Sequence, residues 1–500
     1  MIFLPNLLLH TVVETNSEIW NWLNILYVLF AYSLIIFLVL KTLLQNRNPI
    51  VTMSWIMVLI LIPYFGLLIY FFFGQKTTKK WLYKRISAKE IQEMKKISQN
   101  QLHKVKEEKN LEDIYLNQYK KLISIQLKNN YSFLSSNNSI QLYYSGIELY
   151  KEIIEDLKKA TSFIHLEYYL FENGIMADEI AEVLLEKQRL GLKISLIIDG
   201  IGSRKLSDTY INRLKNNGIE VIVFRPVRFP KLTNKINNRD HKKAIIIDGI
   251  VAYTGGINIS DKYLIKEGEK GFWRDTHMRI SGDSVKMIEA VFLVDRFQLT
   301  SYMPKDLSLF FPKINFPPAS LIQIVANSPD NEKSSIINSF FIAINSAKSN
   351  IRLVSPYFIP NESLLIALKT VAQSGIKVEI IMPKHSDSAF VQNSAFSYVQ
   401  ELLNYRIQVY YYKKGFIHAK TLLIDNNLSI LGTANFDYRS FYHNHEINTI
   451  IYNEEICAKL TQQFRQDKRD SEKVTSNRWR NRPIQNKVLE SLARLIAPLM

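Results

Sequence analysis

Cysteine is nearly absent from this sequence, because Cys457 is the one cysteine among 500 residues. A single cysteine cannot form a disulfide within the chain, and it cannot supply a zinc site made of several thiolates. Nothing around Cys457 indicates a nucleophile, so we expect it to fill space in the core. Stability must then come from hydrophobic burial, and a chain of this length with 47% hydrophobic residues can build a large core in about three domains.

Acidic residues are also in deficit. Asp and Glu together number 46, whereas Lys and Arg number 63, which leaves a formal net charge of +17. Such a surplus favours anionic partners, namely nucleic acid, phospholipid headgroups or a membrane surface. Charge alone does not choose among these three.

Charge of either sign is missing from two long stretches, residues 19–40 and 50–74. Each is long enough to cross a bilayer as a helix, which takes about 20 apolar residues, and each has aromatic residues at one end, as membrane interfaces favour. Two buried helices of a soluble protein are the alternative. A cleaved signal peptide fits poorly, since the first 18 residues contain no Lys or Arg. We predict that residues 1–75 form a two-helix transmembrane hairpin with spans at about 19–40 and 50–74.

The charges that flank these stretches predict an orientation. Residues 76–96 contain eight Lys or Arg and two Glu, whereas Glu14 and Glu18 are the charged residues before the first stretch. The positive-inside rule therefore places the rest of the chain in the cytoplasm, although two basic residues at 41–49 count slightly against this. We predict a basic helical linker at 76–135, which could contact anionic headgroups or remain solvated.

The remainder of the chain repeats its own pattern of strands and helices. In each half an apolar strand is followed by a helix and two further apolar strands, which is typical of an α/β fold with buried sheets. We predict two similar α/β repeats, at 136–315 and 316–500. The predicted elements are strands at 162–171, 193–199 and 221–224 with a helix at 179–190, and then strands at 350–359, 377–382 and 408–412 with a helix at 362–373.

The clearest repetition is the motif H-x-K-x4-D, which occurs late in each half. Seven residues after each Asp a turn with the pattern G-x-x-N begins, and an acidic residue follows further on. One such motif would be a weak signal, whereas two with the same downstream spacing indicate a duplicated site. The first set is His241, Lys243, Asp248, Asn258 and Asp275, and the second is His418, Lys420, Asp425, Asn435 and Glu446.

Each motif offers an imidazole and an ammonium group to one site, because residues two apart on a strand face the same way. A histidine titrates near neutral pH and can act as a nucleophile or as a general acid–base. The lysines supply positive charge for phosphate oxygens, and the amides of Asn258 and Asn435 add hydrogen-bond donors. These groups suit phosphoryl transfer without a metal, since that chemistry depends mainly on position and charge.

Four carboxylates accompany these groups. Asp275 and Glu446 are candidates to orient the histidines through the second ring nitrogen. Asp248 and Asp425 end their strands, so they are either catalytic members of the motif or structural residues of a turn. The sequence favours the structural role without deciding it.

These motifs resemble those of the phospholipase D superfamily, and the wider sequence is similar to bacterial cardiolipin synthases over nearly the whole chain. Departures are few: Ser328 stands where that family usually has glycine, and Lys242 where arginine is usual. The similarity implies phospholipase D-like α/β repeats packed with pseudo-two-fold symmetry behind a membrane hairpin. The residues that carry it are Arg47, Asn48, Pro49, Trp55, Pro63, Gly66, Tyr70 and Gly74, then 238–241, 273–277, 355–360, 435–446, 479–480 and 495–499.

The resemblance implies an activity. Cardiolipin synthases of this kind transfer a phosphatidyl group from one phosphatidylglycerol to another and release glycerol, through a phosphohistidine. By analogy His241 is the nucleophile and His418 the acid–base, although the two motifs are alike in sequence. The implied partners are phosphatidylglycerol and the anionic bacterial inner membrane, with the body on the cytoplasmic side, and no cofactor, metal or nucleic acid is expected. The motifs leave open a phospholipase D-type hydrolase, with water as acceptor, and, less favoured, a phosphodiesterase acting on nucleic acid.

Overall fold

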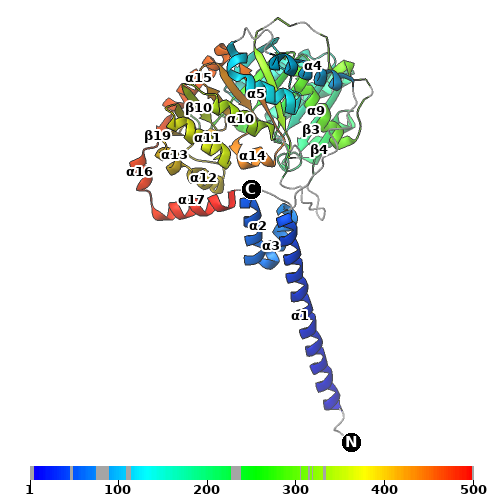
Figure 1. Cartoon of the computed structure of the whole chain (residues 1–500). Coiled ribbons are helices and arrows are strands. Elements are labelled where there is room, and N and C mark those ends of the chain that lie inside the picture. The colour runs from blue at the N-terminus through cyan, green and yellow to red at the C-terminus, as the bar shows by residue number, and fades with distance from the viewer. Residues whose placement is uncertain are drawn as a thin grey trace. The chain divides into compact units, whose positions relative to one another are not determined.

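The computed structural model describes residues 5–44, 49–74, 89–107, 114–226, 238–304, 306–313, 316–317, 319–329 and 334–497 (Figure 1). The chain forms two compact units, a group of helices before residue 77 and an α/β body.

The first half of the body contains a seven-stranded sheet in the order β1-β8-β6-β5-β2-β3-β4. β2, β3 and β4 run parallel, whereas β5, β6, β8 and β1 extend the sheet through antiparallel pairs. Runs of buried isoleucine such as KAIII in β5 suit strands that are covered on both faces. The bounds are β1 Asn138–Tyr143, β2 Phe163–Tyr168, β3 Lys193–Asp199, β4 Glu220–Phe224, β5 Lys243–Ile247, β6 Val251–Gly255 and β8 His277–Gly282.

The second half contains an eight-stranded sheet in the order β19-β13-β12-β10-β15-β16-β18-β9. The strand predicted at 350–359 is divided into β10 and β11, and the short β11 leaves the sheet to pair with β17. The bounds are β9 Leu321–Asn327, β10 Asn350–Val354, β11 Phe358–Ile359, β12 Lys377–Pro383, β13 Gln408–Tyr412, β15 Thr421–Ile424, β16 Leu428–Gly432, β17 Phe436–Asp437, β18 Glu446–Tyr452 and β19 Ser471–Lys473.

The two sheets are copies of one pattern. Apart from the edge strand β19, each strand of the second sheet has a counterpart at the same place and in the same direction in the first. The predicted α/β fold of two similar repeats is therefore confirmed. Two further short strands, β7 (Trp273–Arg274) and β14 (Phe416–Ile417), pair with each other and so join the repeats.

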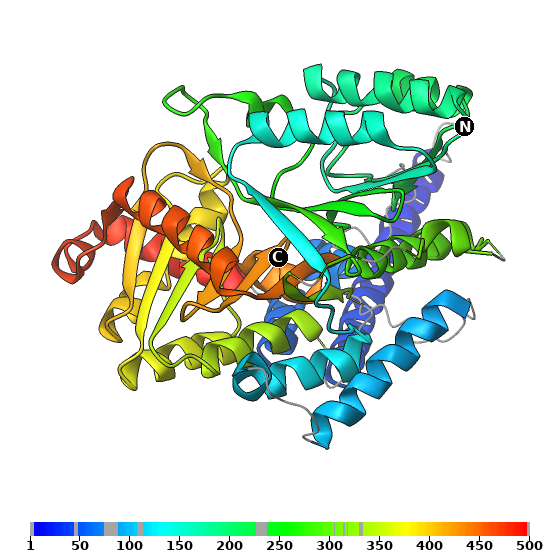
Figure 2. The same cartoon turned by 90° about the horizontal axis from the view of Figure 1, so that it is seen from above.

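Helices cover the outer faces of both sheets and also pack between them (Figure 2). α6 shows why they form, since it buries Leu149, Ile153 and Leu157 at helical spacing toward the first sheet. The bounds are α6 Gly146–Lys159, α7 Ile175–Arg189, α8 Asp208–Asn216, α9 Val285–Thr300, α10 Ser335–Asn345, α11 Glu362–Gln373, α12 Ala389–Phe396, α13 Val399–Asn404, α14 Tyr438–Tyr442, α15 Glu454–Arg469, α16 Ser476–Arg480 and α17 Ile484–Ile496, with 3-10 turns at Asp261–Leu264 and Ser308–Phe310.

One hydrophobic core lies between the two repeats. It contains residues of both sheets, such as Ile246 and Leu423, together with apolar residues of α9 and α15. Helices α4 (Lys89–Lys106) and α5 (Ile114–Asn130) belong to the segment predicted as a linker, and α5 buries Leu122 and Ile123 in the outer core of the second repeat. A shared core of this kind holds the two halves in a fixed relation, which a site between them requires.

The N-terminal unit consists of α1 (Pro5–Leu44), α2 (Pro49–Leu61), α3 (Pro63–Ile69) and a π-helical turn (Tyr70–Gly74). One helix among the described residues is long and apolar enough to cross a membrane, over Trp20–Leu44. The second predicted span, 50–74, is not one helix. It breaks at Ile62, whose backbone leaves the helical region, because the Pro63 ring cannot continue a regular helix.

Candidate active site

His241 is held in place by a backbone bridge between the two repeats. It lies just before β5, and its N–H donates to the carbonyl of His445 (2.9 Å), while the His445 N–H donates to the carbonyl of Arg239 (2.8 Å). This parallel bridge runs beside the first residue of β18, which is Glu446. The chain segment that carries the first motif therefore lies against the acidic residue of the second.

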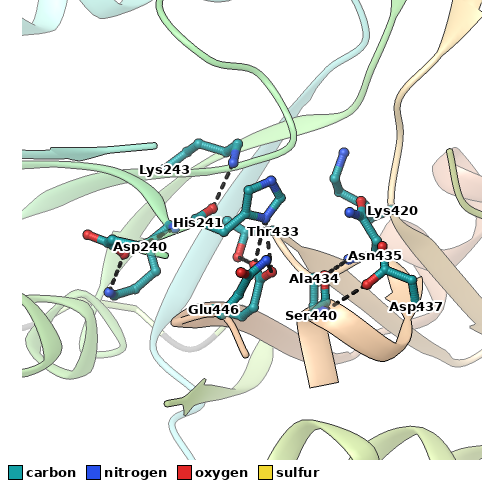
Figure 3. Close-up of polar contacts among 12 residues, drawn as sticks. Asp240, His241, Lys243, Lys420, Thr433, Ala434, Asn435, Asp437, Ser440 and Glu446 are labelled. Atoms are coloured by element: carbon teal, nitrogen blue, oxygen red, sulfur yellow. Dashed lines mark hydrogen bonds and ion pairs between the residues drawn. The ribbon is translucent and has the colours of Figure 1, made fainter. Parts of the chain in front are cut away.

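The side chains of His241 and Glu446 complete this contact. Nδ1 of His241 lies 2.9 and 3.0 Å from the two carboxylate oxygens of Glu446 (Figure 3). The Thr433 hydroxyl donates to Oε2 of Glu446 (2.6 Å), and the Asn444 amide donates to Oε1 (3.2 Å). The carboxylate is thus fixed from three sides and in turn fixes the imidazole, which leaves Nε2 as the ring nitrogen available for chemistry.

His418 has the reciprocal arrangement. β14, which precedes it, pairs with β7, and the His418 N–H donates to the carbonyl of Arg274 (2.7 Å). Nδ1 of His418 lies 2.7 Å from Oδ2 of Asp275. Gly256 makes room for this acid, because a Cβ at that position would overlap Oδ1 of Asp275. Each histidine is therefore oriented by a carboxylate that the other repeat supplies.

The motif lysines point into the same space as the histidines. Nζ of Lys243 donates to the His241 carbonyl (2.7 Å), and Nζ of Lys420 donates to the His418 carbonyl. Figure 3 shows His241, Lys243 and Lys420 side by side, although they come from different repeats. Burial lowers the pKa of Lys243 to about 7, an effect that Glu446 opposes and Lys420 increases. Burial likewise lowers the pKa of Lys420 to about 8.

The surroundings of both histidines favour the neutral imidazole at pH 7. Burial lowers the pKa of His241 to about 4; Glu446 acts against this shift and Lys243 adds to it. Burial also lowers the pKa of His418 to about 4, with Lys420 adding to the shift and Asp275 opposing it. Burial disfavours a charged Glu446, yet its contact with His241, the charge of Lys243 and the Thr433 hydroxyl hold its pKa at about 2, so it stays ionised. A neutral imidazole held against a carboxylate can attack phosphorus.

The two motif asparagines are both buried beside the histidine segments. The amide of Asn258 donates to the Tyr263 hydroxyl (3.3 Å), which itself lies 3.3 Å from Nδ1 of His418. The backbone N–H of Asn435 donates to the Ser440 hydroxyl (3.1 Å), which fixes the turn after β16. Their role toward a substrate stays a prediction.

The motif aspartates lie at the opposite ends of their strands from the histidines, about 20 Å along an extended chain. The Asp248 carboxylate accepts from the backbone N–H groups of Thr161, Ser162 and Phe163 (2.8–2.9 Å). The Asp425 carboxylate accepts in the same way from residues 348–350 (2.8–3.2 Å). Both have a φ of +54°, which suits a turn residue. This geometry favours a structural role over a catalytic one for both aspartates.

Several residues around the histidines were not among the predicted site residues. Tyr263 lies in a 3-10 turn outside both motifs, so no repeated pattern marked it. Thr433 donates a hydrogen bond to Glu446. Its counterpart in the first repeat is Gly256, so a comparison of the two halves does not mark this position as shared. Tyr169 packs edge-on against His241 with ring centroids 4.9 Å apart, and Trp273 lies 5.3 Å from His418.

Comparisons with known proteins agree with this geometry. The family model described as "Cardiolipin synthase, PLD-like domain" matches residues 153–292 and 340–468, and a phospholipase D-nuclease N-terminal model matches 25–75. The chain is 38% identical to a cardiolipin synthase of Clostridium perfringens (strain SM101), over 91% of this chain and 96% of the relative. It is 35% identical to a cardiolipin synthase of Halalkalibacterium halodurans, over 99% and 98%. A solved phosphatidylserine synthase of Haemophilus influenzae shares the fold, with a TM-score of 0.57 at 14% identity over 76% of this chain and 100% of that one.

Two matching domains, each with its own histidine–lysine motif, define a phospholipase D-like enzyme. The relatives identify one family within this class of enzymes, because their similarity to this chain extends through the N-terminal helices as well as both repeats. The chain belongs to the cardiolipin synthase family.

Proposed function

We propose that this chain synthesises cardiolipin by moving a phosphatidyl group from one phosphatidylglycerol to the hydroxyl of another, with release of glycerol. The observation that carries the proposal is the pair of histidines, each held by a carboxylate, with the pKa of both imidazoles lowered by burial and by the two motif lysines. Full-length similarity to cardiolipin synthases supports the choice of lipid. A hydrolase would use the same groups with water as acceptor, and it remains the outcome that would overturn the proposal.

The reaction takes place in two balanced steps. Nε2 of His241 attacks the phosphorus of the first phosphatidylglycerol and the P–O bond to glycerol breaks, while His418 gives that oxygen a proton. His418 then removes a proton from the hydroxyl of a second phosphatidylglycerol, whose oxygen attacks the phosphohistidine and restores His241. The negative phosphodiester offsets the positive charge of Lys420 beside His418, so substrate binding favours the protonated imidazole that the first step needs.

The product assay tests this proposal directly. Full-length protein in proteoliposomes receives labelled phosphatidylglycerol in the presence of EDTA, and the lipids are separated by mass. We expect cardiolipin and glycerol in equal amounts, with activity that persists in EDTA, because the two proposed steps need no metal. Phosphatidic acid as the main product would show that water is the acceptor and would overturn the transferase assignment.

We propose the same anchoring that the charges predict, with the body on the cytoplasmic side of the bacterial inner membrane. The supporting observation is α1, whose apolar part over Trp20–Leu44 suffices to cross a bilayer. We also keep as a proposal the division into an anchor (1–75), a basic segment (76–135) and two repeats (136–315 and 316–500).

Helix α17 supports an anionic membrane surface as the partner of the body. Of the exposed large apolar residues on the described part of the body, six lie on this one helix. Its one acidic residue, Glu490, is buried and accepts from Arg482 (2.6–3.2 Å), whereas Arg478 and Arg480 are exposed nearby. An apolar stripe with a basic border is typical of a helix that lies in a bilayer interface. The six residues are Ile484, Val488, Leu489, Leu492, Leu495 and Ile496.

We expect Leu492→Ser combined with Leu495→Ser to lower cardiolipin formation in proteoliposomes about 10-fold or more, because each lost leucine removes about 1.5–3 kcal/mol of apolar burial. Activity on short-chain phosphatidylglycerol in detergent micelles should stay near that of the parent. A matched control replaces Ile175 and Leu190, which are equally exposed on the body but not on α17. An equal loss in both assays, or in the control, would contradict a membrane role.

The lowered pKa values of the two lysines predict a pH dependence. A lysine binds phosphate only while protonated, so charge is lost as pH rises through about 7 for Lys243 and about 8 for Lys420. We therefore expect kcat/KM for phosphatidylglycerol to fall between about pH 7 and pH 9, since this parameter reports the free enzyme. Lys243→Arg should move the decline to higher pH, because a guanidinium stays charged. A parent profile that is flat to pH 9 would contradict the assignment, and Lys266→Arg, at an exposed site, is the control.

A further inference from the structure

The segment between Pro49 and Gly74 folds back on itself. Trp55 of α2 and Tyr70 at the end of α3 pack edge to face, with ring centroids 5.5 Å apart. In one continuous helix these residues would be about 22 Å apart along the axis, since each residue adds about 1.5 Å. α2 and α3 are therefore two antiparallel arms joined at Ile62.

The arms are packed closely enough to exclude a side chain. A Cβ at Gly66 of α3 would lie 2.5 Å from the carbonyl oxygen of Val58 in α2. Glycine is thus needed for the close approach, as it is where helices meet in membranes. The chain reverses direction at Pro63. A proline suits this first position of α3, because an N–H there would have no acceptor within the helix.

Contacts with α1 fix where the hairpin begins and ends. The hydroxyl groups of Tyr70 and Thr42 lie 2.6 Å apart, and the rings of Tyr64 and Tyr27 stack at 5.9 Å. The base of the hairpin thus lies near the C-terminal end of α1. Its tip lies about 22 Å closer to the N-terminal end of α1. α2 itself has 13 residues, or about 20 Å, which is less than the hydrocarbon thickness of about 30 Å.

The charges agree with a hairpin that does not cross. If residues 49–74 return to the side from which they enter, Lys41, Arg47 and the eight basic residues at 76–96 all lie on one side. Glu14 and Glu18 then lie on the other side. If the same residues crossed the membrane, Lys41 and Arg47 would face away from the body, against the positive-inside rule.

We propose that α1 crosses the bilayer once and that α2 and α3 form a re-entrant hairpin, inserted from the side of the body and held in the hydrocarbon of that side. Among the described side chains of the hairpin, the large exposed ones are aliphatic or aromatic, including Met57, Leu61 and Phe65, and lipid acyl chains are the partner that covers them. This inference concerns the anchor, and it holds whether the body transfers or hydrolyses phospholipid.

Cysteine labelling of the full chain in bacterial cells tests the proposal. The native Cys457 is fully buried, so the parent protein serves as the unlabelled blank. Three variants, Ser17→Cys, Asn46→Cys and Asn216→Cys, report the segment before the span, the segment before α2 and the body. An impermeant maleimide should label Ser17→Cys in intact spheroplasts, and the other two only after the membrane is opened.

The opposite pattern, with Asn46→Cys labelled in intact spheroplasts and Ser17→Cys protected, is that of a two-span hairpin and would overturn the proposal. Protection of all three would also overturn it, because α1 would not cross. A second readout is independent of labelling. Thr42→Cys with Tyr70→Cys should be joined by a short, membrane-permeant thiol cross-linker, because their side chains meet in the structure although the length of the tyrosine keeps the backbones too far apart for a direct disulfide. Mass spectrometry of the digested protein detects the link, whereas two antiparallel spans would hold these residues on opposite sides of the membrane.

Discussion

With His418 replaced by alanine, the protein should still release p-nitrophenol from a phosphatidyl p-nitrophenyl ester in a single burst, whereas with His241 replaced it should release none. A p-nitrophenolate leaves without a proton, so the step no longer needs an acid, but it still needs a nucleophile. On phosphatidylglycerol both variants should lose about 10³-fold or more of their activity, because glycerol needs the proton. Stopped-flow absorbance of the ester and the product assay on the natural lipid measure the two effects.

The burst also reports a covalent intermediate. With His418 gone, no base activates the second lipid, so one phosphatidyl group per protein should remain attached, and intact-protein mass spectrometry should find it on the peptide that contains His241. Attachment to His418 in the His241→Ala variant would reverse the two assignments. Equal bursts from both variants would contradict a single nucleophile.

Replacement of Glu446 or Asp275 should have the same kind of effect as replacement of the histidine that each carboxylate contacts in the other repeat. Glu446→Gln should slow the ester burst by about 10²–10⁴-fold, as loss of the carboxylate behind a catalytic histidine does in serine proteases, because Glu446 orients His241. Asp275→Asn should leave the burst nearly intact and slow the reaction of phosphatidylglycerol, because Asp275 orients His418. The ratio of the two rates separates positioning from a general loss of structure, since unfolding lowers both rates together.

A matched control is available in the first repeat. Glu289 is buried and lies 2.9 Å from Nδ1 of His165, so it forms a histidine–carboxylate pair of the same kind in the core. Glu289→Gln should lower the temperature of unfolding without changing the ratio of the two rates. If Asp275→Asn instead behaved like His241→Ala, each acid would serve the histidine of its own repeat, against the contacts in the structure.

The sequence was sufficient to predict both motifs and the repeated α/β order, because strand periodicity and motif spacing are local properties. It named Asp275 and Glu446 as orienting acids, but it did not show which histidine each one serves. That relation depends on the bridges of His241 to His445 and of His418 to Arg274, which form only when the two repeats dock. No pattern within either half contains this information.

The second apolar stretch shows a different limit. Its 25 charge-free residues at 50–74 match the length of a membrane span, and hydropathy reports length and composition but not direction. The break at Ile62 depends on Pro63 together with Gly66, which lets α3 return along α2. A proline inside a span is common enough that its presence predicts a kink, whereas the reversal requires the packing that glycine permits.

The exchange of carboxylates between repeats also has a consequence for synthesis of the chain. The first repeat leaves the ribosome with a histidine that lacks its acid and an acid that lacks its histidine, so a truncated product has no working site. Lipid chemistry can begin only after the second repeat has folded against the first. By the same geometry, one repeat alone could complete this site only by pairing with a second copy of itself across a two-fold axis, and two separately expressed halves should regain activity on association.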